Sequence, residues 1–289
     1  MIAIYSYWDT IGDLTKSAGN WSNPKFMLYS LVHSVKKSKE HFGYVKMITT
    51  SSCKEIFEKL EIFDEVTTEL DAISHYPKSL WALGKIYAYS IQKEPFIHID
   101  NDAMFENDKI VELSKGYDFI VQELEDPRYE DDINHPFSKG WYYTYIPTLK
   151  FLKEQPKYYL NPNYVEQIKY AYNMGVYGCR DLDFNKRYCE EAFKLVDENI
   201  NFWVNYEKIT KYPNHNVPCF FEQYLIAQMI TYHKLNDKVF RVIQNSTPKE
   251  LGYRHILGSK KSQNWYNWFK NAVEISYPKQ DKIINNLIK

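Results

Sequence analysis

The chain has 289 residues, a length that can bury one large hydrophobic core or two closely packed halves. Its 36 basic and 37 acidic residues leave a formal net charge of −1, so overall charge attracts it neither to nucleic acid nor to an anionic membrane. The 4 cysteines form no C-x-x-C pair and show no metal-type spacing with histidine, which is typical of reduced thiols in a cytoplasmic protein.

The first third of the chain alternates patterns typical of strands and of helices. The predicted strands are 2–7, 44–49, 63–70 and 96–99. The predicted helices are 24–37, 51–60 and 79–92, with Ser51 as the cap of the second one. Such alternation predicts an α/β protein whose central, mostly parallel sheet is flanked by helices on both faces.

The rest of the chain is less regular, and it shows no internal repeat and no clear linker. Its predicted helices are 107–115, 183–206, 217–235, 265–275 and 279–288. Its predicted strands are 118–124, 171–178 and 239–244. The segment 171–178 contains two glycines, where a backbone can approach a ligand closely. The polar segment 125–139 is typical of a surface loop, and such loops sometimes form a lid over a site.

The feature that points most directly to chemistry is the pair Asp100 and Asp102, which follows the apolar strand 96–99. Ligands of open α/β sheets bind just beyond the carboxyl ends of strands. Because residues i and i+2 of an extended chain face the same side, we expect both carboxylates to converge on one hard cation. The alternative is a solvated turn. A second Asp-x-Asp, at Asp181 and Asp183, precedes a helical pattern and is explained by acids at a helix N-terminus.

A cation held by two acids needs a further ligand, and the segment 255–261 offers one. The imidazole of His255 is a suitable donor to Mn²⁺, although a single histidine is more often structural. Lys260 or Lys261 can face phosphate oxygens, and Gly258 would let the backbone approach an anion. Together with the two acids, this segment predicts a binding site for a diphosphate.

Four motifs, taken in this order, resemble those of the retaining enzymes of glycosyltransferase family 8, which have the GT-A fold. They are Asp100-Asn-Asp102, Asn173-Met-Gly175, Glu222-Gln223 and His255-x-x-Gly258-x-x-Lys261. The resemblance extends from residue 1 to about residue 261 and implies a single GT-A domain. Its implied parts are a nucleotide-sugar-binding half (1–106), a sugar and acceptor half (107–261) and a helical tail (262–289).

The resemblance also implies roles for individual residues. Asp100, Asp102 and His255 would hold Mn²⁺ or Mg²⁺ against the diphosphate of a nucleoside-diphosphate sugar, with a UDP-sugar as the expected donor. The residues that would contact the same donor are Lys85, Asn173, Gly175, Gly258 and Lys261, and the candidates for catalysis are Glu222 and Gln223. The implied activity is transfer of a hexose to a hydroxyl of a glycan or a lipid-linked acceptor in a bacterium. Retention and inversion both stay open.

Several positions depart from the family pattern. Ser262 and Gln263 replace the family's Pro-Trp, and Glu222 stands where the family usually has Asp. The first strand lacks the usual acidic base-binding pattern, so Tyr5 or Tyr7 could stack on a base, although alternating residues of a strand are more often core. For Lys85 the alternative is a solvated helix face.

Two other functions stay open. A nucleotidyltransferase of nucleotide-sugar synthesis would need a glycine-rich, basic loop after the first strand, and residues 8–13 lack one. A non-catalytic protein could bind a nucleotide or a sugar without turnover.

The composition of the helical tail, residues 262–289, bears on whether the protein contacts a membrane. The aromatic residues Trp265, Trp268 and Phe269 lie among lysines, which is compatible with weak peripheral contact to the inner face of a membrane. Packing of these rings onto the domain is the alternative. The first residues lack a signal-peptide pattern, and we expect a cytoplasmic protein.

Overall fold

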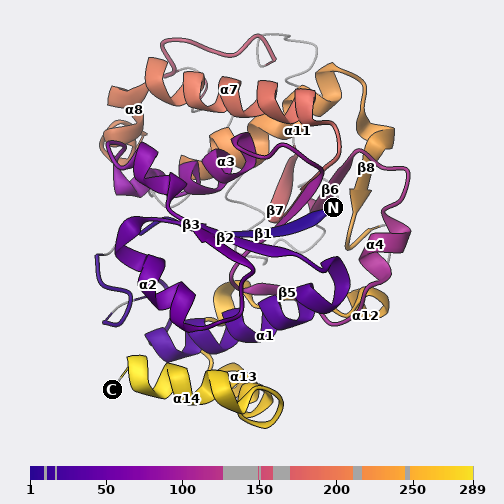
Figure 1. Cartoon of the computed structure of the whole chain (residues 1–289). Coiled ribbons are helices and arrows are strands. Elements are labelled where there is room, and N and C mark those ends of the chain that lie inside the picture. Colours follow the sequence, from indigo (N-terminus) through magenta and orange to yellow (C-terminus); the bar gives the residue numbers. More distant parts are fainter. Residues whose placement is uncertain are drawn as a thin grey trace.

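The structure is a computed structural model that describes residues 1–9, 12–16, 18–125, 149, 151–158, 170–210, 217–244 and 248–288. A seven-stranded sheet lies between two layers of helices, as Figure 1 shows. Its strands are β1 (Ile2–Tyr7), β2 (Val45–Thr49), β3 (Glu65–Thr67), β4 (Phe96–Ile99), β6 (Phe119–Glu125), β7 (Ala171–Cys179) and β8 (Val239–Arg241). A separate pair consists of β5 (Ala103–Phe105) and β9 (Tyr253–His255).

The order of the large sheet is β3-β2-β1-β4-β7-β6-β8. The pairs β3/β2, β2/β1 and β1/β4 are parallel, and β8 is parallel to β6. Only β7 runs antiparallel to the strands beside it, β4 and β6. The predicted α/β architecture with a mostly parallel sheet is therefore confirmed.

Helices cover both faces of the sheet (Figure 1). One face carries α3 (Leu83–Ser90), α7 (Leu182–Glu198) and α11 (Leu225–Tyr232). The other face carries α1 (Pro24–Phe42) and α2 (Ser51–Lys59), and α13 (Gln263–Ser276) and α14 (Pro278–Leu287) pack outside α1. Shorter helical segments are η1 (Glu69–Ile73), η2 (Lys78–Leu80), α4 (Lys109–Leu113), α8 (Ile200–Val204), α9 (Tyr206–Thr210), α10 (Val217–Cys219), η4 (Phe220–Tyr224), η5 (Asn236–Lys238), α12 (Pro248–Leu251) and η6 (Leu257–Ser259).

Strand β1 shows why the parallel half of the sheet was recognisable from its sequence. Ala3 and Tyr5 lie in the hydrophobic cluster beneath α1, whereas Ile4 lies in the cluster beneath α3. All three side chains are fully buried. A strand covered on both faces needs apolar residues at successive positions, and this produces the continuous apolar run that predicted it.

Helix boundaries were predicted less well than the helices themselves. Asp181 and Asp183 lie at the N-terminus of α7, as predicted, and Asp181 caps the helix by accepting a hydrogen bond from the backbone N–H of Phe184 (2.9 Å). Thr50, not Ser51, is the N-cap of α2, and its carbonyl accepts from the backbone N–H of Lys54 (3.2 Å). Ser51 is the first residue of the helix, and its hydroxyl donates to Asp71. The predicted helix 183–206 is interrupted at Asn199, whose side chain donates to the carbonyl of Leu195 (3.0 Å).

The tail aromatics pack onto the fold. Phe269 is fully buried beside Phe26, and the ring of Trp265 lies 5.9 Å from that of Phe269. Trp268 remains 37% exposed, with the guanidinium of Arg254 over its ring at 5.6 Å. The packing alternative therefore accounts for this composition, and the contacts lend no support to a membrane surface. Among the described helices, none is both long enough and apolar enough to cross a bilayer.

The four cysteines are all buried, and this gives a chemical prediction. Burial raises the pKa of the Cys53 thiol to about 11 and that of the Cys179 thiol to about 12. We expect an aromatic disulfide reagent at pH 8 to react with the thiols only after the protein is unfolded in denaturant. Absorbance of the released thiolate measures this, and rapid reaction of Cys53 or Cys179 in the native protein would contradict their burial.

Candidate metal and diphosphate site

The two acids lie in a tight turn at the carboxyl end of β4. Asn101 and Asp102 form this turn, and the backbone N–H of Ala103 donates to the carbonyl of Asp100 (2.9 Å). The chain is therefore not extended between the acids, contrary to the reason given for their convergence. The predicted strand ends at Ile99, and the short strand β5 begins directly after the turn.

The pairing of β5 with β9 brings His255 to the acids. The two strands are antiparallel, with Ala103 opposite His255, and the backbone N–H of Ile256 donates to the carbonyl of Asp102 (3.0 Å). One ligand atom from each of Asp100, Asp102 and His255 lies within 4.8 Å of the others, a spacing that one cation can bridge. The predicted convergence of these three side chains is confirmed, and cation binding by them stays a prediction.

Two lysines face the acids. The ammonium of Lys260 lies 2.8 Å from Asp102 Oδ2, and that of Lys85 lies 2.9 Å from Asp100 Oδ1. Burial alone would raise the pKa of Asp102, but His255 and Lys260 outweigh burial and hold it well below its usual range. The carboxylate of Asp102 is therefore ionised at neutral pH and can serve as a ligand.

Lys85 is buried at the centre of this charge network, so the alternative of a solvated helix face is wrong. Besides Asp100, its ammonium contacts Glu222 Oε1 (2.5 Å) and donates to the carbonyl of Met174 (2.9 Å). Burial would lower the pKa of Lys85, but the carboxylates of Asp100 and Glu222 outweigh burial and raise it. The site therefore contains a fixed cation beside its acids.

Glu222 and Gln223 lie on the π-helical segment η4, between α10 and α11. Such segments are common at functional sites, but nothing in the local residues distinguishes one from an ordinary helix. The side chain of Glu222 is 0% exposed, and burial raises its pKa to about 7. Because the carboxylate of Glu222 is buried and contacts Lys85, a substrate cannot reach it in this structure. The prediction that Glu222 takes part directly in catalysis is therefore corrected. Gln223 is 9% exposed.

Asn173 and Gly175 lie on β7 beside the acids. Asn173 Oδ1 accepts from the backbone N–H of Gly175 (3.0 Å), and Asn173 Nδ2 donates to Glu125 (2.8 Å). The carbonyl of Gly175 accepts from the N–H of Asp100 (3.0 Å). A Cβ at Gly175 would lie 2.5 Å from the ring of His255, and closer still to Gln122 Oε1. The absence of a side chain at Gly175 therefore leaves the space that the ring of His255 occupies.

This contact predicts a strong effect for Gly175→Ala. The added methyl must displace the His255 ring or the Gln122 amide that contacts it. We therefore expect the affinity of the predicted site for Mn²⁺ to fall about 10- to 100-fold, the range seen when a ligand loses its orientation. Calorimetric titration with Mn²⁺ measures the change. Gly116→Ala is the control, because a Cβ there would meet no atom within 4 Å. Its left-handed backbone (φ 85°) costs stability, but the Mn²⁺ affinity should match that of the wild type. Unchanged affinity in Gly175→Ala would contradict the packing.

Four predicted donor-binding residues do not join the cluster. Tyr5 is 0% exposed and its hydroxyl contacts Ser34 (2.6 Å), so the prediction that it stacks on a base is wrong. Tyr7 packs edge to face with Phe57. Lys261 is exposed, and its neighbour Lys260 contacts the acids instead. A Cβ at Gly258 would meet no atom within 4 Å, so no close approach requires glycine there.

Sequence reasoning missed one residue of the site, Gln122. Its side chain is buried on β6, and its Oε1 lies 2.5 Å from His255 Nδ1. The available signal was a polar residue directly after the apolar run Phe119–Val121 and inside the predicted strand 118–124. The predicted lid, 125–139, lies outside the described residues except for Glu125.

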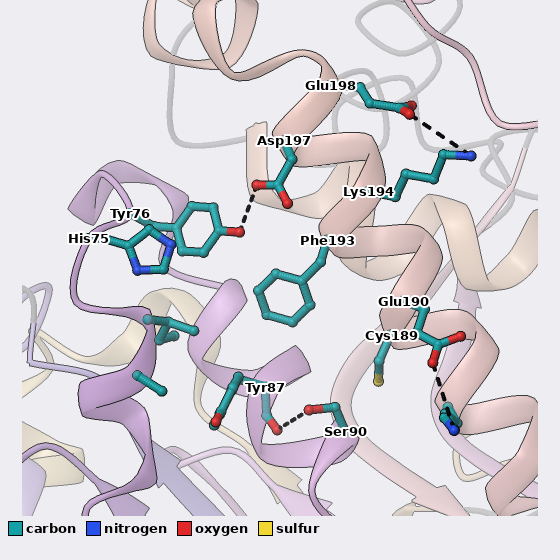
Figure 2. A pocket seen from close by; sticks show the side chains of 13 residues that line it. His75, Tyr76, Tyr87, Ser90, Cys189, Glu190, Phe193, Lys194, Asp197 and Glu198 are labelled. Carbon is teal, nitrogen blue, oxygen red and sulfur yellow. Dashed lines mark hydrogen bonds and ion pairs between the residues drawn. The ribbon is translucent and has the colours of Figure 1, made fainter.

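A separate groove of about 750 Å³ lies between α3 and α7 (Figure 2). Its aromatic lining is formed by His75, Tyr76, Tyr87 and Phe193. The hydroxyl of Tyr76 donates to Asp197 (2.6 Å), which fixes one wall. None of the acids and lysines described above lines this groove.

The fold and the cluster together define an α/β protein with a candidate cation site at the carboxyl end of its central strand. The chain belongs to a family described as "Family of unknown function (DUF6734)", whose model matches residues 1–287. A comparison with curated protein sequences gives no match.

Several solved structures are similar to this chain. Mouse xyloside xylosyltransferase 1 in its apo form has 11% identity and a TM-score of 0.39, with 83% of this chain and 84% of that chain covered. The galactosyltransferase LgtC, in complex with donor and acceptor sugar analogues, has 10% identity and a TM-score of 0.42, with 100% and 97% covered. The bifunctional glycosyltransferase WbbM in its apo form has 9% identity and a TM-score of 0.42, with 99% and 51% covered.

Proposed function

We propose that this protein is a metal-dependent glycosyltransferase with a single GT-A domain. It moves a hexose from a nucleoside-diphosphate sugar, with UDP as the expected nucleotide, to a hydroxyl of a glycan or a lipid-linked acceptor. The observation that carries the proposal is the convergence of Asp100, Asp102 and His255 within 4.8 Å at the carboxyl end of β4. The four motifs that resemble glycosyltransferase family 8 support it from the sequence.

The donor set suits a hard divalent cation. Two carboxylates and one imidazole are ligands that Mn²⁺ accepts, and Mg²⁺ also favours the carboxylates. When bound, the cation would neutralise charge on the departing nucleoside diphosphate. Lys260 lies 2.8 Å from Asp102, so its ammonium is well placed to contact the same diphosphate. Gly258 and Lys261, on the same segment, are proposed to border it.

The sugar would lie on the side of β7 and η4. Gln223 and Asn173 are the polar side chains proposed to contact it. Glu222 is proposed to act through Lys85, with its buried carboxylate holding the ammonium 2.5 Å away and therefore beside Asp100. Lys85 in turn would contribute positive charge near the donor phosphates and oppose charge build-up on the leaving group.

The proposal is tested by measuring nucleotide release. Purified protein is incubated with a panel of UDP-sugars and GDP-sugars, with Mn²⁺ or with a chelator, and free nucleoside diphosphate is quantified. We expect Mn²⁺-dependent release of UDP from one or a few UDP-sugars, faster when the acceptor is present. Failure to release any nucleoside diphosphate, with acceptors supplied from a glycan array, would contradict the proposal.

The same assay separates the alternatives. A nucleotidyltransferase would instead release pyrophosphate from a nucleoside triphosphate and a sugar phosphate. A non-catalytic protein would bind the nucleotide-sugar, as shown by a thermal shift, and leave it intact.

A further inference from the structure

Gln122 is a buried amide whose hydrogen bonds all lie within the site. It is 2% exposed. Its Nε2 donates to Glu123 Oε1 (2.8 Å), and its Oε1 accepts from the hydroxyl of Tyr253 (2.7 Å) and from His255 Nδ1 (2.5 Å). These three partners come from β6 and β9, so the amide joins the large sheet to the strand that carries His255.

The backbone at Gln122 departs from regular strand geometry, and this turns the side chain towards His255. The register of β6 against β7 shifts between Val121 and Glu123, as at a β-bulge. Adjacent residues of a regular strand point to opposite faces, but a bulge can turn a side chain towards a site. Here the irregularity allows Gln122 to reach both Glu123 and His255.

The partners also fix which way the amide faces. A carboxylate only accepts hydrogen bonds, so the amide nitrogen must face Glu123 and the amide oxygen must face His255. A carbonyl oxygen cannot donate. His255 Nδ1 must therefore carry a proton, whether or not Nε2 also carries one.

This geometry leaves Nε2 as the nitrogen available to a cation. Nε2 lies 3.2 Å from Asp102 Oδ2, on the side of the acids. Without Gln122, the carboxylate of Asp102 would favour a proton on Nε2, the nitrogen that must be unprotonated to bind a cation. We propose that Gln122 is a positioning residue that holds the proton of His255 on Nδ1 and so presents Nε2 to the cation. This inference rests on the proposed metal site.

The space for this arrangement is provided by Gly175. A Cβ at that position would clash with both Gln122 and His255. The glycine of the Asn173-Met-Gly175 motif therefore serves the pair formed by the amide and the imidazole, because both pack directly against its Cα. If Gln122 only stabilised the fold, its hydrogen bonds to Glu123 and Tyr253 would suffice, and the hydrogen bond to His255 Nδ1 would have no role.

The test combines nitrogen NMR of the histidine rings with calorimetric titration of Mn²⁺ alone. Spectra are recorded on the metal-free protein at pH 8, with His255 assigned by His255→Ala. We expect wild type to carry a proton on Nδ1. Gln122→Met, which keeps the bulk without the oxygen, should move it to Nε2 and weaken Mn²⁺ binding about 10- to 100-fold.

Two further variants isolate the role of the oxygen. Gln122→Glu keeps an oxygen that accepts from His255 Nδ1, while its second oxygen replaces the donating amide nitrogen and must share a proton with the carboxylate of Glu123. With that proton in place, this variant should keep the Nδ1 proton and bind Mn²⁺ no more than about threefold more weakly than wild type. Tyr253→Phe removes the other hydrogen bond to the same oxygen and should leave both readouts unchanged. Because wild type and these two variants are informative on their own, the test does not depend on the folding of Gln122→Met.

The outcomes separate the two proposals. An unprotonated Nδ1 in wild type would overturn the inference, and so would an unchanged ring and unchanged affinity in Gln122→Met. Equal weakening in Tyr253→Phe and Gln122→Met, without any change in the ring protons, would also overturn it. The proton of His255 could move from Nδ1 to Nε2 in Gln122→Met although the wild type binds no Mn²⁺. This result would support the effect of Gln122 on the His255 ring and contradict the proposed metal site.

Discussion

Asp102→Ala is expected to reduce Mn²⁺-dependent release of UDP by about 10³-fold or more. The substitution removes one proposed ligand, and it leaves Lys260 and His255 without the carboxylate that both now contact. A bound cation contributes several kcal/mol to stabilising charge on a leaving group, and each 1.36 kcal/mol changes a rate about tenfold. Steady-state rates over a range of Mn²⁺ concentrations measure the loss.

The matched control is Asp183→Ala, which alters the other Asp-x-Asp of the chain. Asp183 is exposed in the first turn of α7, whereas Asp181 is the capping residue. Its removal should leave the rate unchanged within about twofold. Equal activity of Asp102→Ala and wild type at limiting Mn²⁺ would remove the metal assignment.

Lys85→Met is expected to be the most destabilising substitution in the site, with a cost of about 3–5 kcal/mol in the free energy of unfolding at pH 8. The ammonium contacts Asp100 and Glu222, and both carboxylates would lose their buried cation. Urea denaturation measures the cost. Lys186→Met is the control, because its pair with Glu190 is exposed and should contribute less than about 1 kcal/mol.

The cost should depend on pH with a definite sign. Burial already raises the pKa of Glu222 to about 7, and loss of the opposing Lys85 charge would raise it further. The folded variant then holds a proton that the unfolded chain releases at lower pH, so its stability falls as pH rises from about 5 towards 8. The penalty should therefore be smaller at pH 5 than at pH 8. In Lys85→Met/Glu222→Gln the pH dependence of the penalty should decrease, and an unchanged dependence would contradict the role of Glu222.

The sequence predicted well those parts of the molecule whose signal is local. Strands β1 and β4 were found with their observed boundaries, because strands buried on both faces are continuous apolar runs. Asp181 and Asp183 were correctly interpreted as acids at a helix N-terminus, because the capping bond that Asp181 forms joins residues only three apart.

The pairing of β5 with β9 could not be predicted in this way. Each strand has only three residues, too few for a recognisable period, and they lie about 150 residues apart. Their pairing nevertheless places His255 opposite Ala103 and so completes the cluster. The three ligands were predicted from residue types and from the resemblance, whereas the reason for their convergence became clear only from the structure.

The other corrections have the same origin. Which of two adjacent lysines reaches the acids depends on the turn after η6, and the structure selects Lys260. Whether Tyr5 faces a ligand or the core depends on what covers that face of β1, and α1 covers it through Ser34 and Ser38. Local residue patterns specify neither.

The most direct test of the central claim is a crystal structure of the protein with Mn²⁺ and UDP, with the cation located by its anomalous scattering. We expect one Mn²⁺ bound by the carboxylates of Asp100 and Asp102 and by His255 Nε2, in contact with the diphosphate. A Mn²⁺ ion bound elsewhere, or UDP bound while Asp100 and Asp102 remain paired only with Lys85 and Lys260, would contradict the account.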